Sequence, residues 1–242
     1  MGRAGRLRTA HVSASSAAAV TLRIHRSHGG QGRFALEAGP FTSVLDLLFT
    51  AQRRFDRSLV FRFACRIGVC GSCAVRINGR EGLACRTRAR DVGPEIALEP
   101  LRHLPVVRDL AVDLRPFRAA YAAALPALRP SAEVRTAPTP RAPALPEIGG
   151  QGDCIACAAC YSASETVATA PGYPGAAALI RAASLLADPR DGAHAARIGA
   201  LTPWLALDDP EATVVCPKGL RHETALARLR AVAARAGADA QA

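Results

Sequence analysis

Apolar and polar residues alternate in two short stretches near the start of the chain, a period that is typical of β-strands. Residues 18–25 and 33–37 show this alternation and flank a turn at 28–32, so we expect them to pair as a hairpin. From Val44 onward the apolar positions recur every three or four residues, as on one face of a helix, and Thr42 stands where an N-cap is expected. A hairpin followed by an amphipathic helix is therefore predicted.

The alternating pattern returns after residue 73. Residues 74–77 and 83–85 flank Asn78-Gly79, a dipeptide that favours a tight hairpin turn, and residues 95–98 supply a last strand. Together with the first hairpin and its helix, these strands predict a small mixed-sheet domain in the first half of the chain.

The second half has a helical pattern. Six prolines between residues 126 and 146 lie among small and polar residues, which predicts a linker. Beyond it, alanine-rich segments of high helix propensity predict helices at 175–187, 193–201 and 223–234. The predicted organisation is a flexible N-terminus (1–18), a sheet domain (19–115), a Pro-rich linker (116–150) and an all-helical domain (151–242).

Eight cysteines divide into two sets, one in each half of the chain. The first set is Cys65, Cys70, Cys73 and Cys85; the second is Cys154, Cys157, Cys160 and Cys216. Four thiolates per site suit a [2Fe–2S] or a [4Fe–4S] cluster, and two such sites use every cysteine. Thiolates that bind iron must be kept reduced, which favours a cytoplasmic protein over a secreted one.

The first set has the C-x4-C-x2-C…C spacing of plant-type [2Fe–2S] ferredoxins. Gly68 and Gly71 lie inside its loop, where a tight turn must aim backbone N–H groups at sulfur. The alternative is a zinc site, although zinc knuckles prefer paired C-x2-C units. This spacing favours a [2Fe–2S] cluster.

The second set begins as the bacterial ferredoxin run C-x2-C-x2-C, but Ser164 stands where the fourth cysteine is expected. Cys216, followed by Pro217, can close the site from a distance, because the cysteine before proline in that motif ligates a different cluster. One [4Fe–4S] cluster is the economical interpretation, with zinc again as the alternative.

The strongly basic composition does not by itself predict nucleic-acid binding. The net charge is +11, yet the arginines are scattered and aromatic residues make up only 5% of the chain. Arg62, Arg66 and Arg86 flank the first cysteine set and could offset an anionic cluster.

No apolar run approaches the ~20 residues of a membrane span, so we expect a soluble chain. Three arginines within residues 1–19 resemble a mitochondrial transit peptide, although an unstructured bacterial N-terminus is the favoured interpretation.

With both cysteine sets in hand, the chain resembles the iron–sulfur subunit of succinate dehydrogenase and fumarate reductase along nearly its whole length. The stretches that carry the resemblance are residues 61–73, 104–113, 174–180, 188–191 and 216–220. The resemblance implies a β-grasp ferredoxin domain followed by a helical ferredoxin domain, docked on a flavoprotein with covalent FAD. Electrons would pass singly between that flavin and an acceptor, and the dicarboxylate chemistry would belong to the flavoprotein. A membrane anchor could hold the complex at the cytoplasmic face of the inner membrane, or at the matrix side in a eukaryote.

The chain departs from this family at the third cluster. The family's [3Fe–4S] ligands fall on Ser164, Ala206 and Ala212, none of which is a cysteine, so we expect no such cluster. The tryptophan and histidine of the quinone pocket correspond to Thr169 and Leu207, which puts quinone reduction at that site in doubt.

Two interpretations of the acceptor side stay open: a different acceptor served by the [4Fe–4S] cluster, or a region that lost its cluster while the complex still meets quinone. An adaptor for another flavoenzyme with a non-quinone acceptor is the alternative function. A surface loop is the plainest interpretation of residues 208–210, although the sequence does not decide it. We expect Trp204 to pack between helices, and His222 to lie at the surface or at a partner contact.

Overall fold

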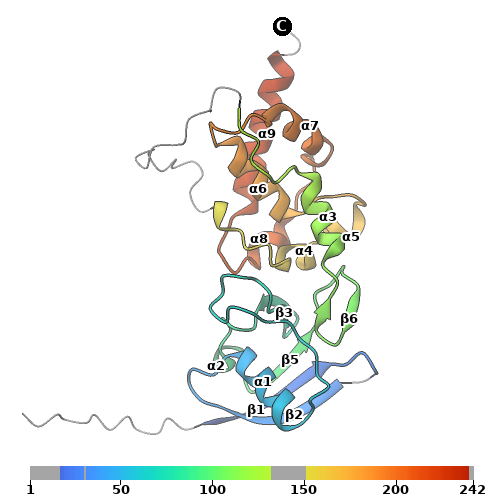
Figure 1. The fold of residues 1–242 in the computed structure, drawn as a ribbon, viewed down its shortest axis with the longest axis vertical. Helices are drawn as coiled ribbons and strands as arrows, with labels where there is room; N and C mark the ends of the chain where they lie inside the picture. Colours follow the sequence, from blue (N-terminus) through green and yellow to red (C-terminus); the bar gives the residue numbers. More distant parts are fainter. Residues whose placement is uncertain (1–16, 30, 132–150, 240–242) are drawn as a thin grey trace, which may run out of the picture.

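The computed structural model describes residues 17–29, 31–131 and 151–239. The molecule is elongated, with a β-sheet at one end of its long axis and a helical bundle at the other (Figure 1). The predicted linker residues 132–150 and most of the predicted N-terminal segment lie outside the described residues. The change from sheet to helices along the chain agrees with the two halves read from the sequence.

The sheet of the first half has five strands in the order β2-β1-β5-β3-β4. Its strands are β1 (Ala18–His25), β2 (Gln31–Ala38), β3 (Ala74–Ile77), β4 (Arg80–Leu83) and β5 (Glu95–Glu99). The pair β1–β5 is parallel, while β1–β2, β3–β4 and β3–β5 are antiparallel. The mixed sheet is therefore confirmed. Strand β4 begins at Arg80, earlier than predicted, because Asn78 and Gly79 alone make the turn, both with positive φ (49° and 81°).

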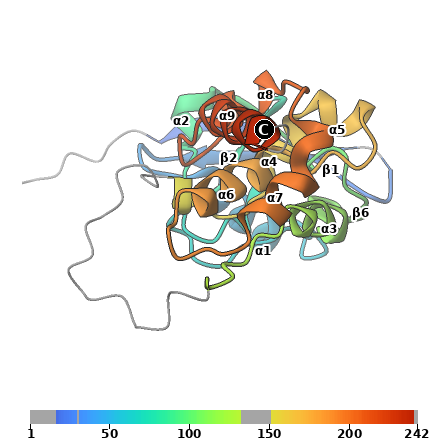
Figure 2. The same cartoon turned by 90° about the horizontal axis from the view of Figure 1, so that it is seen from above.

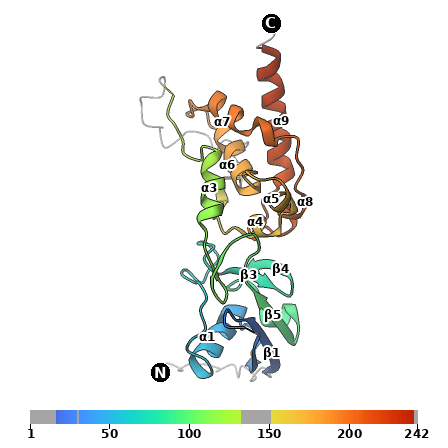
Figure 3. The same cartoon turned by 90° about the vertical axis from the view of Figure 1, so that its right-hand side faces the viewer.

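Helix α1 (Val44–Arg54) covers one face of the sheet (Figure 3). Its leucines, among them Leu45 and Leu48, are buried against alternate sheet residues such as Leu22. The N-cap is Ser43, which forms a capping box with Asp46, so the assignment of the cap to Thr42 is wrong. The Thr42 hydroxyl instead accepts a hydrogen bond from the Gly39 N–H (2.9 Å) and closes the preceding turn.

The connection between the two halves is more ordered at its start than the sequence predicts. After the short helix α2 (Ala89–Val92), strands β6 (Val106–Arg108) and β7 (Ala111–Val112) form a two-stranded ribbon, which leads to helix α3 (Arg115–Ala123). Residues 116–123 were predicted as linker, but Phe117 is 2% exposed and packs against Tyr161 of the helical half. Helix α3 was missed because the proline-rich stretch that follows it led us to assign the whole segment as linker.

The helical half is built around α6, which is apolar on nearly all sides. Its elements are η1 (Gln151–Asp153), α4 (Ala159–Ala163), α5 (Glu165–Thr169), α6 (Ala176–Leu186), α7 (His194–Leu201), η2 (Thr202–Trp204), α8 (Pro210–Val214) and α9 (His222–Asp239). Seen along the long axis, α6 lies beside α9, α7 and α3 (Figure 2). The three longer predicted helices are confirmed within one or two residues, except that α9 extends to Asp239. Across the described ranges, no helix has the length and apolar character needed to cross a membrane.

A buried ion pair holds the end of the connection against the helical half. The Arg197 guanidinium of α7 is fully buried and lies 2.8 Å from the carboxylate of Asp191. The same carboxylate accepts a hydrogen bond from the Arg129 N–H (2.9 Å), and Arg197 also donates to the Leu125 carbonyl. Burial raises the pKa of Asp191, but these donors outweigh it and the net pKa lies below its usual value.

Two interpretations of the region around the start of α9 need correction. Residues 208–210 are not simply a surface loop, because Asp209 is 1% exposed and Pro210 begins α8. His222 is 2% exposed, so it does not lie at the surface. Trp204 packs edge-to-face on Tyr173 with a centroid separation of 6.4 Å, as expected for a packing residue.

Candidate iron–sulfur centres

The first cysteine set is brought together by the loop between α1 and β3 and by the end of β4. The loop carries Cys65, Cys70 and Cys73, and the Ala84 N–H donates to the Cys73 carbonyl (3.1 Å), which holds Cys85 beside Cys73. Gly68 and Gly71 have positive φ (79° and 72°), a conformation that glycine adopts at little cost. The predicted role of these glycines in a tight turn is confirmed.

Backbone amides of this loop point at sulfur. The Val69 N–H donates to Cys65 Sγ (3.4 Å) and the Cys65 N–H donates to Cys70 Sγ (3.5 Å). A hydrogen bond from the Cys70 thiol, aided by the Ile67 N–H, lowers the pKa of Cys65 to about 6. Burial has the opposite effect on Cys73 and raises its pKa to about 12, so iron must displace this proton on binding.

Two arginines lie over the first loop. A Cβ at Gly68 would stand 2.8 Å from Arg86 Cδ, which shows how closely the Arg86 side chain crosses the loop. Arg66 pairs with Asp46 (3.2 Å) and lies over the Phe49 ring (5.4 Å from its centroid). These cations reduce the cost of placing an anionic cluster here.

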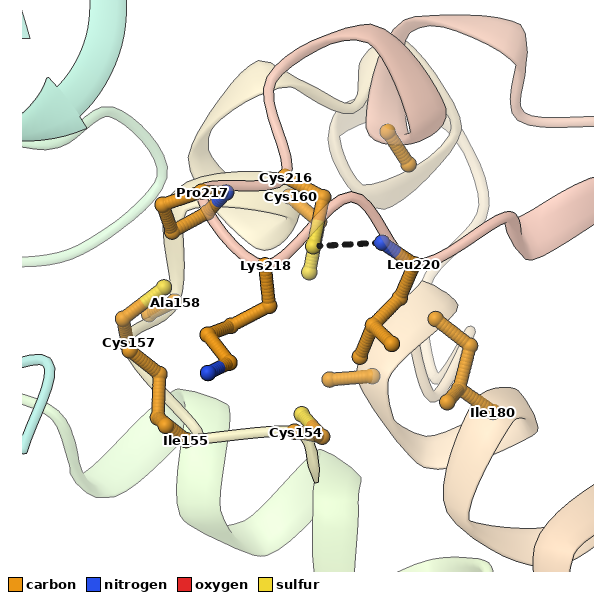
Figure 4. A pocket seen from close by; sticks show the side chains of 12 residues that line it. Cys154, Ile155, Cys157, Ala158, Cys160, Ile180, Cys216, Pro217, Lys218 and Leu220 are labelled. Atoms are coloured by element: carbon orange, nitrogen blue, oxygen red, sulfur yellow. Dashed lines mark hydrogen bonds between the residues drawn. The ribbon is translucent and has the colours of Figure 1, made fainter. Parts of the chain in front are cut away.

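The second set lines one cavity in the helical half (Figure 4). Cys154 and Cys157 come from the turn that leads into α4, Cys160 comes from α4 itself, and Cys216 comes from the loop after α8. Apart from these cysteines and Lys218, the lining is apolar: Ile155, Ala158, Ala177, Ile180, Ala212, Pro217 and Leu220. The structure therefore brings all four cysteines predicted for the second site to one cavity.

This cavity suits thiolates that are neutralised by iron. The Leu220 N–H donates to Cys216 Sγ (3.4 Å), and the lone lysine Lys218 extends between the cysteines (Figure 4). Burial raises the pKa of Cys157 to about 11 and also raises the pKa of Cys160 well above its usual value, so both thiols stay protonated until metal binds. Although the four cysteines line one cavity, no group of three or more His, Cys, Asp or Glu side chains in the described ranges is arranged closely enough to hold a single metal ion. A four-thiolate donor set in an apolar cavity fits the predicted [4Fe–4S] cluster.

The two sites lie directly against each other. A Cβ at Gly71, in the first loop, would stand 2.6 Å from Cys157 Cβ and 2.9 Å from Cys157 Cα. Normal carbon–carbon contact is about 3.5–4.0 Å, so only a glycine leaves room for this approach. The two candidate sites are thus in backbone contact, with no layer of side chains between Gly71 and Cys157.

Polar contacts fix this arrangement of the two halves. Ser162 of α4 donates to the buried Glu81 carboxylate (2.8 Å) and accepts from the Arg102 N–H (2.7 Å). Arg102 also pairs with Glu165 (2.8 Å), and Arg80 donates to the Val214 carbonyl (2.7 Å). The sequence gives no signal for this network, because its members are far apart in the chain and none belongs to a motif.

Ser164, Ala206 and Ala212, the positions expected for a third cluster, differ in burial and in the groups that surround them. Ser164 is fully buried and caps α5, while its hydroxyl donates to Asp209 (2.9 Å). Ala212 is buried in α8 and lines the second cavity, and Ala206 is exposed. The Ser164 hydroxyl is thus already engaged by a carboxylate. Sequence reasoning missed Asp209, because a pair of acidic residues before a proline is typical of a surface turn.

Comparisons with known proteins agree with this architecture. Residues 22–119 match a family described as a 2Fe-2S iron-sulfur cluster binding domain. A succinate dehydrogenase iron-sulfur subunit of Paracoccus denitrificans is 33% identical over 210 residues, covering 80% of this chain and 76% of the relative. A fumarate reductase iron-sulfur subunit of Mycobacterium tuberculosis is 35% identical over 208 residues, covering 79% of this chain and 81% of the relative.

A solved structure extends the match to three dimensions. It is titled the Mycobacterium smegmatis Sdh1 complex in the apo form, and it superposes with a TM-score of 0.79 and 26% identity. The match covers 91% of this chain and 97% of the other. The sheet half with its 2Fe-2S family match, the helical half and the length of the sequence matches lead to one conclusion: the chain belongs to the family of iron–sulfur subunits of succinate dehydrogenase and fumarate reductase.

Proposed function

We propose that this chain is the electron-transfer subunit of a succinate dehydrogenase or fumarate reductase-type complex. It passes single electrons between the FAD of a partner flavoprotein and an acceptor, and the chemistry on the dicarboxylate belongs to the partner. Bound clusters would supply one-electron carriers that a chain of ordinary amino acids lacks. Family membership and the relatives' names support this role.

The first cysteine set would hold a [2Fe–2S] cluster and the second a [4Fe–4S] cluster. The observation that carries the proposal is the contact of Gly71 with Cys157, because it sets the two sites in series without an intervening side-chain layer. The loop amides and Arg86 stabilise negative charge at the first site, and the apolar lining excludes water from the second. The chain's own contribution is to hold, separate and shield the two carriers.

The flavoprotein would dock over the first loop. Phe63, Ile67 and Val69 in or beside this loop are 47%, 64% and 57% exposed, a cluster of large apolar side chains that water covers poorly. Such a cluster next to a redox site suits a permanent partner whose flavin must come close. A membrane anchor would hold the assembled complex at the cytoplasmic face of the inner membrane.

We propose that the complex works without a [3Fe–4S] cluster. Ala206 and Ala212 offer no ligand atom, and the Ser164 hydroxyl is committed to Asp209 and to the cap of α5. Electrons would therefore leave the chain from the second site. The acceptor would then have to approach the helical half.

The test is anaerobic purification of the chain with whatever binds it, followed by addition of succinate. Electron paramagnetic resonance (EPR) would then follow reduction at the two sites. The proposal predicts a bound flavoprotein and reduction by succinate at the first site at least. An intact, flavin-bearing complex whose sites reduce with dithionite but never with succinate would contradict the dicarboxylate assignment.

A further inference from the structure

A buried polar cluster lies where the family's third cluster is missing. Asp209 is 1% exposed, and one of its carboxylate oxygens, Oδ2, accepts a hydrogen bond from Ser164. The other oxygen, Oδ1, is buried without a partner at normal hydrogen-bond distance, although the Tyr173 hydroxyl lies near the carboxylate. An unsatisfied buried carboxylate oxygen is costly, so this arrangement calls for an explanation beyond the cap of a five-residue helix.

Two further polar atoms nearby lack partners as well. The hydroxyl of Tyr173 and Nε2 of His222 are buried without a partner at normal distance. Tyr173 is close enough to Asp209 to lower the carboxyl pKa, and the His222 ring meets the Asp209 backbone. Burial lowers the pKa of His222, which keeps its ring neutral near pH 7. The cluster therefore has the donors and acceptors needed to hold one additional proton.

The cluster adjoins both solvent and the second cysteine site. A pocket of about 560 Å³ between α8 and α9 is lined by Asp209 and His222 together with the exposed residues Asp208 and Glu223. On the inner side, the Ala212 N–H donates to the Asp209 carbonyl (3.3 Å), and Ala212 lines the cavity of Cys154, Cys157, Cys160 and Cys216. Asp209 and Ala212 are three residues apart, which corresponds to about 4.5 Å along a helix axis.

We propose that Asp209 takes up one proton from solvent when one electron enters the second cysteine site, and releases it when the electron leaves. The inference rests on the proposed function, in which the partner flavoprotein supplies that electron. Charge balances, because one positive charge arrives for each negative one. The lost third cluster is thereby replaced by a proton-exchange site.

The electrostatics favour this coupling. Burial outweighs the hydrogen bond from Ser164 and raises the pKa of Asp209 to about 6, near enough to neutrality for one added negative charge to protonate it. At an effective dielectric constant of about 20, a unit charge about 10 Å from a carboxyl group would tighten its proton binding roughly tenfold.

The other ionisable side chains around Asp209 do not supply this proton site. Tyr173 and Glu211 of α8 act on Asp209 directly, and His222 of α9 meets its backbone. Cys160 and Asp208 act on Tyr173, while Asp208, Glu223 and Arg230 act on His222. Arg230 is paired with Asp208 (3.0 Å), and Glu223 accepts from Thr213 (2.6 Å). Burial and the nearby Asp209 raise the pKa of Tyr173 far above neutrality, so it stays protonated.

The test is the midpoint potential of the second site as a function of pH, measured by EPR-monitored redox titration of the full chain carrying its clusters. In the wild type the potential should fall as pH rises from about 6 to about 7, because the deprotonated carboxylate disfavours reduction. Tenfold tighter proton binding in the reduced state corresponds to a total fall of about 59 mV. Asp209→Asn, which keeps an oxygen for Ser164, should abolish the slope and hold the potential near the low-pH value.

Two variants and a second readout separate this role from a structural one. Glu211→Gln removes an exposed carboxylate from the same helix and should keep the slope. Ser164→Ala removes a hydrogen bond that lowers the Asp209 pKa, and should move the slope to higher pH. The infrared difference spectrum of reduced minus oxidised protein should show a protonated carboxyl band that Asp209→Asn lacks.

A flat wild-type potential, or a slope that survives in Asp209→Asn, would overturn the inference. Loss of the slope in Glu211→Gln would do so too, since any nearby charge would then suffice. A second site with no [4Fe–4S] signal at all would instead contradict the proposed function, so the two failures are distinguishable.

Discussion

Substitution of Gly71 by alanine tests the direct contact between the two sites. The new Cβ would stand 2.6 Å from Cys157 Cβ and 2.9 Å from the Cys157 Cα, which cannot rotate away because it belongs to the backbone. The position also has φ +72°, where an L-residue is strained. The loop that carries the first set must then move off the second, by about 1 Å to restore normal contact.

The magnitude follows from a matched control. Gly79 lies in the turn between β3 and β4 with φ +81° and has no atom within 4 Å of a new Cβ. Gly79→Ala therefore meets only backbone strain, about 1–2 kcal/mol. Gly71→Ala meets the same strain plus overpacking of about 1–3 kcal/mol, so it should lose that much more free energy of unfolding.

The assay is anaerobic denaturant unfolding of the cluster-loaded chain, followed by circular dichroism and by the visible absorption of the clusters. The magnetic interaction between the two reduced sites, read by EPR, should weaken in Gly71→Ala and stay unchanged in Gly79→Ala. Equal destabilisation of both variants with unaltered magnetic interaction would refute the contact between the loop and Cys157.

Three further predictions concern the helical half and its cavity. The pKa of Asp209 is about 6 in the folded state, whereas its ordinary value is 3.8. As pH rises from about 4 to about 6, the free energy of unfolding of the wild type should therefore fall relative to that of Asp209→Asn, by about 3 kcal/mol in all, and then level off. Urea titrations in which the difference between the two proteins stays constant across that range would contradict this. Arg197→Met leaves the buried Asp191 carboxylate without its arginine partner and should cost about 3–5 kcal/mol, whereas Arg88→Met, at a pair with Asp91 that is about half-exposed on both sides, should cost under about 1 kcal/mol in the same titration. Cys216→Ser should reduce bound iron from about six to about two atoms per chain and leave the first site's EPR signal intact, while loss of both signals would argue against independent assembly.

The sequence predicted the sheet, the longer helices and the grouping of the second cysteine set because local patterns determine them. Alternating residues such as Leu22 and Ile24 are buried as the period requires, and the Asn78-Gly79 turn sets the register of β3 and β4. The spacing of Cys154, Cys157 and Cys160 anticipated a site that closes with Cys216. Each of these signals is contained in a few neighbouring residues or in a known motif spacing.

The rest depends on contacts between residues far apart in the chain. The cap of α1 is an exception, because the Ser43-x-x-Asp46 spacing is that of a capping box, whereas Thr42 would have Leu45 at the third helical position. Phe117 is recognisable as a core residue only once α3 lies against Tyr161. The burial of Asp209 requires Ser164, Tyr173 and α9 to meet around it, and its position beside Pro210 gave the opposite signal.

The central claim is that this chain carries electrons through two clusters in series and lacks the third of its family. EPR spectra of the anaerobically purified complex, recorded oxidised and then after stepwise reduction, test it most directly. The account predicts no [3Fe–4S] signal in the oxidised protein and two signals on reduction, one from a [2Fe–2S] and one from a [4Fe–4S] cluster. A [3Fe–4S] signal in the oxidised protein, or a colourless protein that contains zinc, would contradict it.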